Sequence, residues 1–449
     1  MHTTLPRGDE QRARAALDSV GVFNLLTDER FFDTLEAHLP PYRERLYTPT
    51  QTLAMFVCQV LSDDRSCRRV VDEHIARCAL HGQRVPSSST GAYCDARQRL
   101  PPSLVSVLCD EVARVARTIA TGEPCVPAPA TLLIDGTGFS MPDTPENQQA
   151  FPQSASQREG CGFPQGRLVG LVCATTGVVV DRHVTPAKGK GTGESTALRA
   201  MIERIEPGTL VIGDAIYEDF FAWALLEQAH CAAIFEVHGS RGLPHPLPRR
   251  LTFKRPCRPV WMSPEQYATI PRTRTLRVVV STRPGCEDRY LITSLLDEQR
   301  HPDEAVLAEF ARRWDIELDF RSFKDGLGAG VLGCRTPEMV AKELDVHVLG
   351  YNLIRLLMSE AAAAAGLEPR QISFRHTQQC WSAWVLMGVP LNQANWQVLL
   401  DRIAQHRVRN RPGRKEPRAV KRRPKRTVWL NLPRAQAREV RHLYERTGR

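Results

Sequence analysis

The middle of the chain carries short apolar segments in an order that few folds allow. Three strand-like segments come first, and a helix, a strand, a second helix and a further strand follow. The segments cover residues 131–134, 167–173, 178–184, 194–205, 209–214, 220–229 and 232–237. Thr175 to Gly177 separates the second and third strands and is typical of a tight hairpin. The pattern predicts an α/β fold in which hairpin-linked strands share one sheet with strands joined through helices.

This order is typical of an RNase H-like fold, in which the first and fourth strands are adjacent. Asp135 directly follows the first strand segment, and Asp214 ends the fourth. Adjacent strands would bring the two carboxylates together at one edge of the sheet. A single aspartate at a strand end is more often a turn former or a helix cap. The two aspartates therefore indicate a functional site only if other suitable side chains lie close to them.

A third carboxylate lies on a helix predicted for residues 310–324. At about 100° per residue, Phe310, Arg313, Glu317 and Lys324 fall within about 60° of one another. One stripe would then carry an aromatic ring, two cations and a carboxylate, which suits an anionic partner. Because a carboxylate repels phosphate, such a stripe also requires a divalent cation. The alternative is a surface helix with ordinary salt bridges between its own residues.

The spacing of these four residues resembles the Tyr-x2-Arg-x3-Glu-x6-Lys signature of the IS4 family of DDE transposases, with Phe310 in place of Tyr. Residues 134–137, 140–147 and 188–194 resemble the same family, so the resemblance covers roughly residues 40–430. It implies an enzyme that cuts DNA at the ends of an insertion sequence and transfers the 3'-hydroxyl to target DNA. One departure is Asp214-Ala-Ile-Tyr217, where many relatives have Arg after the aspartate.

The resemblance implies that Asp135, Asp214 and Glu317 are the catalytic residues and hold two Mg2+ ions. Three carboxylates that converge without cations would raise one another's pKa, and two divalent ions remove this conflict. The ligands are all hard oxygens, so Mn2+ is expected to substitute for Mg2+. In the family the carboxylate of the first strand bridges both ions, and Asp135 matches that position.

The resemblance also assigns Arg313 and Lys324 to phosphates at the transposon end. Phe310 lacks the hydroxyl of the usual Tyr, so stacking or packing remains for its ring. Lys188 and Lys190 lie in a glycine-rich loop that we expect near the active site and DNA. This loop is not a phosphate-binding P-loop. That motif has Ser or Thr directly after its lysine, whereas Lys190 is followed by Gly191.

Two further DNA contacts are predicted from composition. Trp261 is a candidate for stacking on a displaced base, with a place in the core as the alternative. Between residues 407 and 426, eleven of twenty residues are Arg or Lys, including Arg422 and Arg423. Prolines interrupt this run, so we expect an arm that orders on a phosphate backbone, or else a solvated tail.

Changes in composition divide the chain into five predicted parts. These are a helical N-terminal DNA-binding domain (1–125), the first part of the RNase H-like core (126–237), a β-rich insertion subdomain (238–288), the second part of the core with the 310–324 helix (289–365), and a C-terminal helical region with the basic arm (366–449). The insertion explains the 103 positions between Asp214 and Glu317, because a structureless loop of that length is improbable. Segments 67–77 and 88–99 are both candidates for the DNA recognition helix.

Composition limits the partners and the location. A net charge of +10 and a pI near 9.1 predict a polyanionic partner. No apolar run approaches about 18 residues, so we expect no membrane contact. The first ten residues lack the apolar core of a secretory signal. We therefore expect a cytoplasmic, nucleoid-associated bacterial protein. The thirteen cysteines form no Cys-x2-Cys pair and are expected to be reduced.

The sequence leaves two other functions open: a metal-dependent nuclease without strand transfer, and a DNA-binding relative without activity. A recombinase with a Tyr or Ser nucleophile is a poorer match, because it would not require three acids. The expected partners are double-stranded DNA of the transposon ends and of the target. Members of the family act as dimers, so a homodimer is expected in the synaptic complex.

Overall fold

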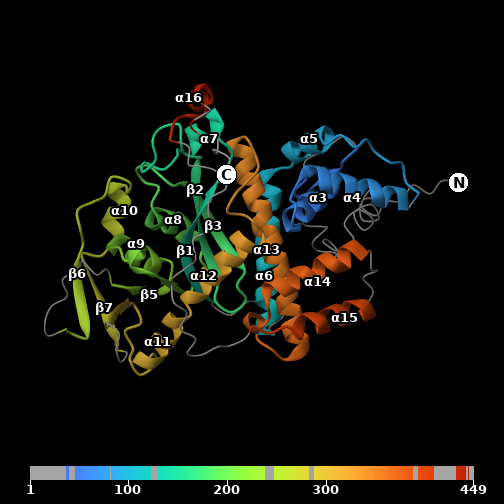
Figure 1. Cartoon of the computed structure of the whole chain (residues 1–449). Helices are drawn as coiled ribbons and strands as arrows, with labels where there is room; N and C mark the ends of the chain where they lie inside the picture. Colours follow the sequence, from blue (N-terminus) through green and yellow to red (C-terminus); the bar gives the residue numbers. More distant parts are fainter. Residues whose placement is uncertain are drawn as a thin grey trace.

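The computed structural model describes residues 37–39, 46–80, 82–122, 130–237, 247–282, 288–387, 393–408, 431–440 and 443. Within these residues, a central sheet has helices on both sides, and a group of helices extends from one end of it (Figure 1). Most of the first 45 residues of the predicted helical N-terminal domain lie outside the described residues. No described helix is long and apolar enough to cross a membrane, and the cysteines in the described ranges are free thiols, as predicted.

The sheet has eight strands in the order β3-β2-β1-β4-β5-β8-β7-β6. Their bounds are Thr131–Ser140 (β1), Gln165–Cys173 (β2), Val179–Pro186 (β3), Leu210–Gly213 (β4), Ala232–Glu236 (β5), Arg250–Lys254 (β6), Thr273–Ser281 (β7) and Arg289–Thr293 (β8). The first three strands are antiparallel, whereas β4 and β5 run parallel to β1. The mixed α/β order predicted from the sequence is confirmed.

β1 is longer than its predicted segment, and this changes the place of Asp135. Residues 131–133 of β1 pair with β4, which ends at Gly213, whereas β2 pairs with β1 from Leu132 to Ser140. Asp135 therefore lies inside a strand, and the prediction that it ends one is wrong. It stands where β1 loses its neighbour on one side. Asp214 does follow the last residue of its strand, as predicted.

The α-helices are α3 (Pro49–Leu61), α4 (Cys67–Leu80), α5 (Gly91–Arg99), α6 (Pro102–Thr121), α7 (Pro145–Ala150), α8 (Glu194–Met201), α9 (Phe220–Gln228), α10 (Pro264–Thr269), α11 (Asp303–Ala311), α12 (Trp314–Arg321), α13 (Pro337–Ala365), α14 (Phe374–Met387), α15 (Gln393–Ala404) and α16 (Arg434–Glu439). Short 3-10 turns, η2 (Ile202–Arg204), η3 (Ala215–Tyr217) and η5 (Pro369–Gln371), and a π-helical turn, η4 (Ser322–Gly326), complete the described elements.

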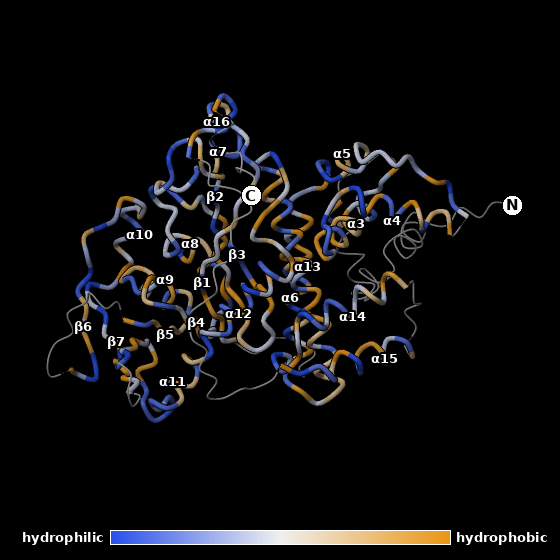
Figure 2. Tube along the Cα trace, in the orientation of Figure 1, coloured by the Kyte–Doolittle hydropathy of each residue, from blue (hydrophilic) through white to orange (hydrophobic). Residues whose placement is uncertain are grey.

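The main core is built around α13. This 29-residue helix begins at Pro337, where the Thr336 hydroxyl caps the backbone N–H of Met339, and it ends at Gly366 in the left-handed region. Twenty of its residues are buried, so it packs on several sides and not along a single stripe. Figure 2 shows apolar stretches along α3, α6 and α13. These helices share one apolar cluster with strands β1 to β5.

The N-terminal helices are partly separate from this core. The region 1–125, predicted to be helical, contains α3, α4, α5 and α6 among its described residues, and the two candidate recognition segments, 67–77 and 88–99, fall largely on α4 and α5. Together α3, α4 and α5 enclose a smaller apolar cluster that contains Met55, Val71 and Tyr93. However, α3 and α6 also belong to the main core, so the helical N-terminal region is continuous with that core.

The predicted insertion, residues 238–288, does not form a sheet of its own. Its described strands β6 and β7 pair with each other, and β7 pairs with β8, which in turn pairs with β5. The insertion therefore extends the central sheet by a hairpin (Figure 1). Helix α10 packs its Ile270 end against Phe221 of α9, which fixes the insertion to the core on a second side.

Candidate active site

Asp135 and Asp214 lie on neighbouring parallel strands. Leu133 of β1 lies beside Ile212 of β4, and Asp214, directly after β4, lies close enough for its charge to act on Asp135. Neighbouring strands are about 4.8 Å apart. The structure thus brings together the two aspartates that sequence reasoning placed at one sheet edge. Their catalytic role stays a prediction.

The two aspartates have different surroundings. The Asp135 carboxylate accepts a hydrogen bond from the Gly136 N–H at 2.7 Å. Burial is the largest cause that raises the pKa of Asp135, to about 6; the negative charges of Glu194 and Asp214 add to this rise, and the Gly136 hydrogen bond and Arg313 oppose it. Asp214 caps the turn η3 by accepting the Ile216 N–H at 2.9 Å. Asp214 therefore also has the ordinary capping role of an aspartate after a strand.

The single helix predicted for residues 310–324 is wrong. Helix α11 ends at Ala311, α12 begins at Trp314, and from residue 322 the chain forms the π-helical turn η4. At the joint, the backbone N–H of Arg313 bonds to the carbonyl of Phe310 at 3.0 Å, which is the tighter three-residue spacing of a turn. The predicted stripe is consequently divided among three elements.

The four signature side chains differ in exposure. Phe310 is 6% exposed and packs in the main core, so its burial supports packing and not contact with DNA. Arg313 is 8% exposed, whereas the Glu317 side chain is 40% exposed. Lys324 is half-buried, and its aliphatic stem lies against Gly330. The predicted contacts of Arg313 and Lys324 with phosphates stay predictions.

Arg313 connects the third acid with the first. Its guanidinium pairs with Glu317 at 3.6 Å and lies 4.7 Å from the centre of the Trp314 ring. Its charge also lowers the pKa of Asp135. The Nε of Arg313 is buried and has no hydrogen-bond partner among the described residues. Arg313 is thus a nearly buried cation that balances carboxylates from α12 and β1.

Glu194 is a fourth carboxylate at this site, and sequence reasoning missed it. It is the first residue of α8, and its side chain is 13% exposed. One carboxylate oxygen accepts a hydrogen bond from the Tyr217 hydroxyl at 2.8 Å, and the other lies 3.4 Å from the Arg167 guanidinium. A signal for it is present in the sequence, because Glu194 ends the segment 188–194 that resembles the IS4 family.

The donor atoms near Asp135 suit a hard divalent cation. They are carboxylate oxygens, and a cation would offset the mutual repulsion that contributes to the raised pKa of Asp135. Within the described residues, however, no group of three or more His, Cys, Asp or Glu side chains is close enough to hold one ion. Glu317 is paired with Arg313 and is not grouped with the aspartates.

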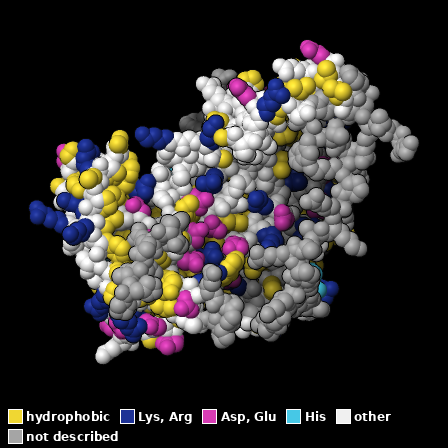
Figure 3. Space-filling model, turned by 60° about the vertical axis from the view of Figure 1, so that its left-hand side comes forward, with side chains coloured by type: hydrophobic (Ala, Val, Ile, Leu, Met, Phe, Trp, Pro, Cys, Tyr) yellow, Lys and Arg dark blue, Asp and Glu magenta, His cyan; other side chains and the backbone are white. Residues whose placement is uncertain are grey.

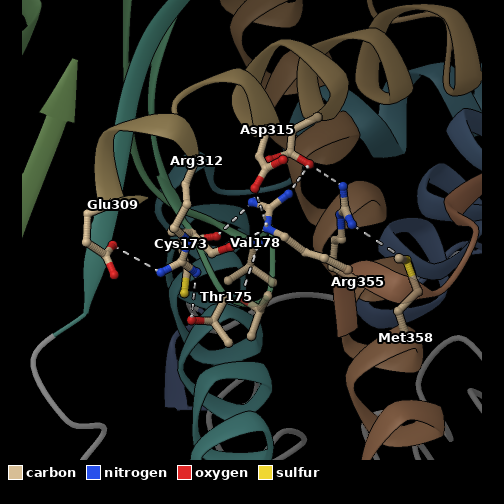
Figure 4. A network of polar contacts seen from close by, with 12 residues as sticks. Cys173, Thr175, Val178, Glu309, Arg312, Asp315, Arg355 and Met358 are labelled. Carbon is tan, nitrogen blue, oxygen red and sulfur yellow. Dashed lines mark hydrogen bonds and ion pairs between the residues drawn. The ribbon is translucent and has the colours of Figure 1, made fainter. Parts of the chain in front are cut away.

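A buried ionic network holds α12 against the core (Figure 4). Asp319, 1% exposed, pairs with Arg355 of α13 and with Arg370 of η5, the latter at 3.0 Å. Arg370 also donates to the carbonyls of Cys173 and Ala174 after β2. Because Glu317 lies two residues before Asp319, this network fixes the segment that carries the third acid.

The other predicted DNA contacts are scattered. Lys188 and Lys190 are exposed on the loop after β3. Trp261 is 48% exposed, meets Phe221 edge to face at 5.8 Å and carries the Arg199 guanidinium 4.3 Å from its ring centre, so it is partly packed and partly open. Arg422 and Arg423 lie outside the described residues.

On the face shown in Figure 3, acidic side chains gather near the centre, with Lys and Arg side chains around them.

The transposase DDE domain family matches residues 127–353, half of the chain and the whole span from β1 into α13. The chain therefore belongs to the DDE transposases. The transposase InsG for insertion sequence element IS4 of Escherichia coli (strain K12) is 28% identical over 365 residues, which cover 77% of this chain and 79% of that protein. This similarity confirms membership of the IS4 family.

Among solved structures, a cryo-EM structure of the piggyBac transposase synaptic complex with hairpin DNA matches with a TM-score of 0.41 and 10% identity. The match covers 90% of this chain and 86% of that chain.

Proposed function

We propose that this DNA transposase cuts both ends of its insertion sequence and joins each freed 3'-hydroxyl to target DNA, with Asp135, Asp214 and Glu317 as metal-binding catalytic residues. The observation that carries the proposal is that Asp135 on β1 and Asp214, directly after the parallel neighbour β4, lie close enough for the charge of Asp214 to act on Asp135. The order β3-β2-β1-β4-β5, with three antiparallel strands followed by two that are parallel to β1, supports an RNase H-like core.

Each part of the site has a separate task in this proposal. Asp135 and Asp214 hold the cations at the open side of β1, and Glu317 approaches from α12. Two Mg2+ ions, or Mn2+ in their place, would activate the attacking water or 3'-hydroxyl and stabilise the leaving oxygen. Arg313 keeps the carboxylates of β1 and α12 charge-balanced before metal and DNA arrive.

Double-stranded DNA is the proposed partner, as both transposon end and target. The net charge of +10 and the exposed Lys188 and Lys190 support this. We assign end recognition to the helical region 1–125 and further phosphate contacts to the basic run 407–426. A homodimer that pairs the two ends is proposed on the resemblance to the family.

The test uses Asp135→Asn, Asp214→Asn and Glu317→Gln in the full chain, with Glu309→Gln as the control. Glu309 pairs with Arg312 at 3.2 Å on the neighbouring helix α11, so the control removes an ion-paired carboxylate outside the proposed metal site. Because loss of a residue that only supports a ligand already costs about 10- to 100-fold, each site variant is expected to lose at least about 100-fold of its Mg2+-dependent cleavage of end DNA. Binding of end DNA should persist.

Full cleavage by the triple variant would contradict the catalytic assignment. Strand transfer is tested separately with pre-cut ends that expose a 3'-hydroxyl. The proposed transposase yields a product in which the end is joined to target DNA. A nuclease without strand transfer would yield cleavage of intact ends and no joined product from the pre-cut ends.

A further inference from the structure

Glu194 is the acidic side chain at the site whose role the proposed chemistry leaves open. It comes from α8, which crosses the sheet beside β1, and its carboxylate occupies the space over Gly136. A Cβ at residue 136 would lie 2.6 Å from the Glu194 Cδ. Glycine at 136 therefore allows this carboxylate to approach the backbone directly after Asp135.

Two donors hold the Glu194 carboxylate in place. The Tyr217 hydroxyl and the Arg167 guanidinium both lie against its oxygens. As the first residue of α8 it also benefits from the partial positive charge at the start of a helix. A carboxylate with such partners carries its charge in a nearly buried position. Its neighbour Asp135 has no direct ion pair among the described residues.

Glu194 also connects both proposed metal-binding aspartates. It acts on Asp135 across Gly136. Through the hydroxyl of Tyr217 it reaches η3, the turn whose first N–H groups are capped by Asp214. Tyr217 is fully buried, so its hydroxyl has little freedom to choose another acceptor. One side chain thus contacts β1 directly after Asp135 and the turn that follows Asp214.

We propose that Glu194 is a positioning residue of the metal site, which holds the Asp214 turn against β1 and whose negative charge increases the affinity of Asp135 and Asp214 for a divalent cation. This inference rests on the proposed function, because it requires that the two aspartates bind metal. A cation between Asp135 and Asp214 would gain from the nearby charge of Glu194 without direct coordination by it.

The experiment measures Mn2+ binding to the full-length protein without DNA, by calorimetry, for Glu194→Gln, Tyr217→Phe and the control Glu206→Gln. Glu194→Gln keeps the shape and an acceptor for Tyr217 but removes the charge. Tyr217→Phe removes the hydrogen bond but keeps the charge. Glu206 pairs with Arg117 at 2.7 Å away from the site, and its variant controls for the loss of an ion-paired glutamate.

We expect Glu194→Gln to weaken Mn2+ binding about 10- to 100-fold, the range for residues that support metal ligands. Tyr217→Phe should weaken it less, and Glu206→Gln should leave it unchanged. In cleavage assays on end DNA, the Glu194→Gln variant should need more Mn2+ for half-maximal rate and recover most of its rate at saturating Mn2+. A purely structural role would shift the unfolding midpoint without this recovery.

Mn2+ affinity of a folded Glu194→Gln variant within about twofold of the unmodified protein would overturn the inference. If that variant does not fold, Gly136→Ala takes its place, because the added Cβ displaces the Glu194 carboxylate; unchanged affinity there would overturn it equally. The proposed function fails in a different way: Asp135→Asn and Asp214→Asn would then leave Mn2+ binding unaltered. Weakened binding in these two variants but not in Glu194→Gln would refute only the role of Glu194.

Discussion

Burial raises the pKa of two carboxyls of this chain to similar values, in unlike settings. Asp135 rises from 3.8 to about 6 at the proposed metal site, with the charges of Glu194 and Asp214 as additional causes. Glu360 rises from 4.5 to about 7 on α13, where burial is the raising cause and a hydrogen bond with Trp396 of α15 opposes it. A raised pKa alone therefore does not identify a functional carboxyl here. The neighbouring acids of Asp135 distinguish it.

Glu360 gives a prediction for stability as a function of pH. Its folded pKa lies above its unfolded value, so between about pH 4.5 and 7 the folded protein binds more protons and loses stability as the pH rises. Glu360→Gln resembles the protonated form. We expect it to raise the free energy of unfolding at pH 8 by about 1–2 kcal/mol, less than the full shift implies because the side chain stays partly hydrated.

The measurement is denaturant unfolding of Glu360→Gln and the unmodified protein at several pH values. The difference between the two proteins should shrink toward zero as the pH falls to about 4.5, because the unmodified side chain then becomes neutral as well. A difference that is constant between pH 5 and 8 would show that ionisation of Glu360 is not the cause.

At the scale of single residues, sequence predicted the two aspartates and missed their partner. Asp135 and Asp214 follow apolar strand segments, and strand order alone brings them together. Glu194 follows a glycine-rich loop, and no periodic pattern indicates which way its side chain turns. Its place depends on Tyr217 and Arg167, whose positions follow from the folded sheet and are not evident in the sequence.

At the scale of elements, strands and long helices were predictable, whereas the break between α11 and α12 was not. Neither Gly nor Pro marks the joint at Arg312 and Arg313, and the local pattern reads as a continuous helix. The break follows from tertiary packing, because Phe310 is buried in the core while Trp314 is 48% exposed. In a regular helix these two residues, four positions apart, would lie on the same face.

The Asp319 network predicts how firmly α12 is attached. In Asp319→Ala, the Arg355 and Arg370 guanidiniums lose their shared buried partner, and unpaired buried charge typically costs about 3–5 kcal/mol. Asp315→Ala is the matched control, because Asp315 also faces Arg370, at 3.8 Å, but is 34% exposed. It should cost less than about 1 kcal/mol.

Denaturant unfolding at pH 7 measures both variants. Cleavage of end DNA should fall in Asp319→Ala as well, because α12 carries Glu317. Equal losses of stability in the two variants would show that the buried position of Asp319 adds nothing, and would argue against the network as the anchor of α12.

At the scale of the whole molecule, the described helices before residue 126 complete the core of the catalytic part. The buried surface of α13 packs against α3 and α6 as well as against the sheet, and residues from all of these belong to one apolar cluster. Lys342 of α13 donates hydrogen bonds to the carbonyls of Arg97 and Gln98 at the end of α5. The predicted boundary at 125 therefore crosses a continuous core.

This continuity predicts that residues 126–449 do not fold on their own. Their expression without residues 1–125 would expose the side of α13 that α3 and α6 cover, and an apolar surface of this kind favours aggregation. We expect the full chain to show cooperative unfolding by near-ultraviolet circular dichroism, and the shortened chain to lack both the fixed aromatic signal and a cooperative transition. As the matched control, deletion of residues 409–449, which removes most of the basic run and α16 but leaves α3, α6 and α13 in place, should preserve cooperative unfolding. A shortened chain 126–449 that unfolds cooperatively would show that the catalytic part is an autonomous domain despite its shared core.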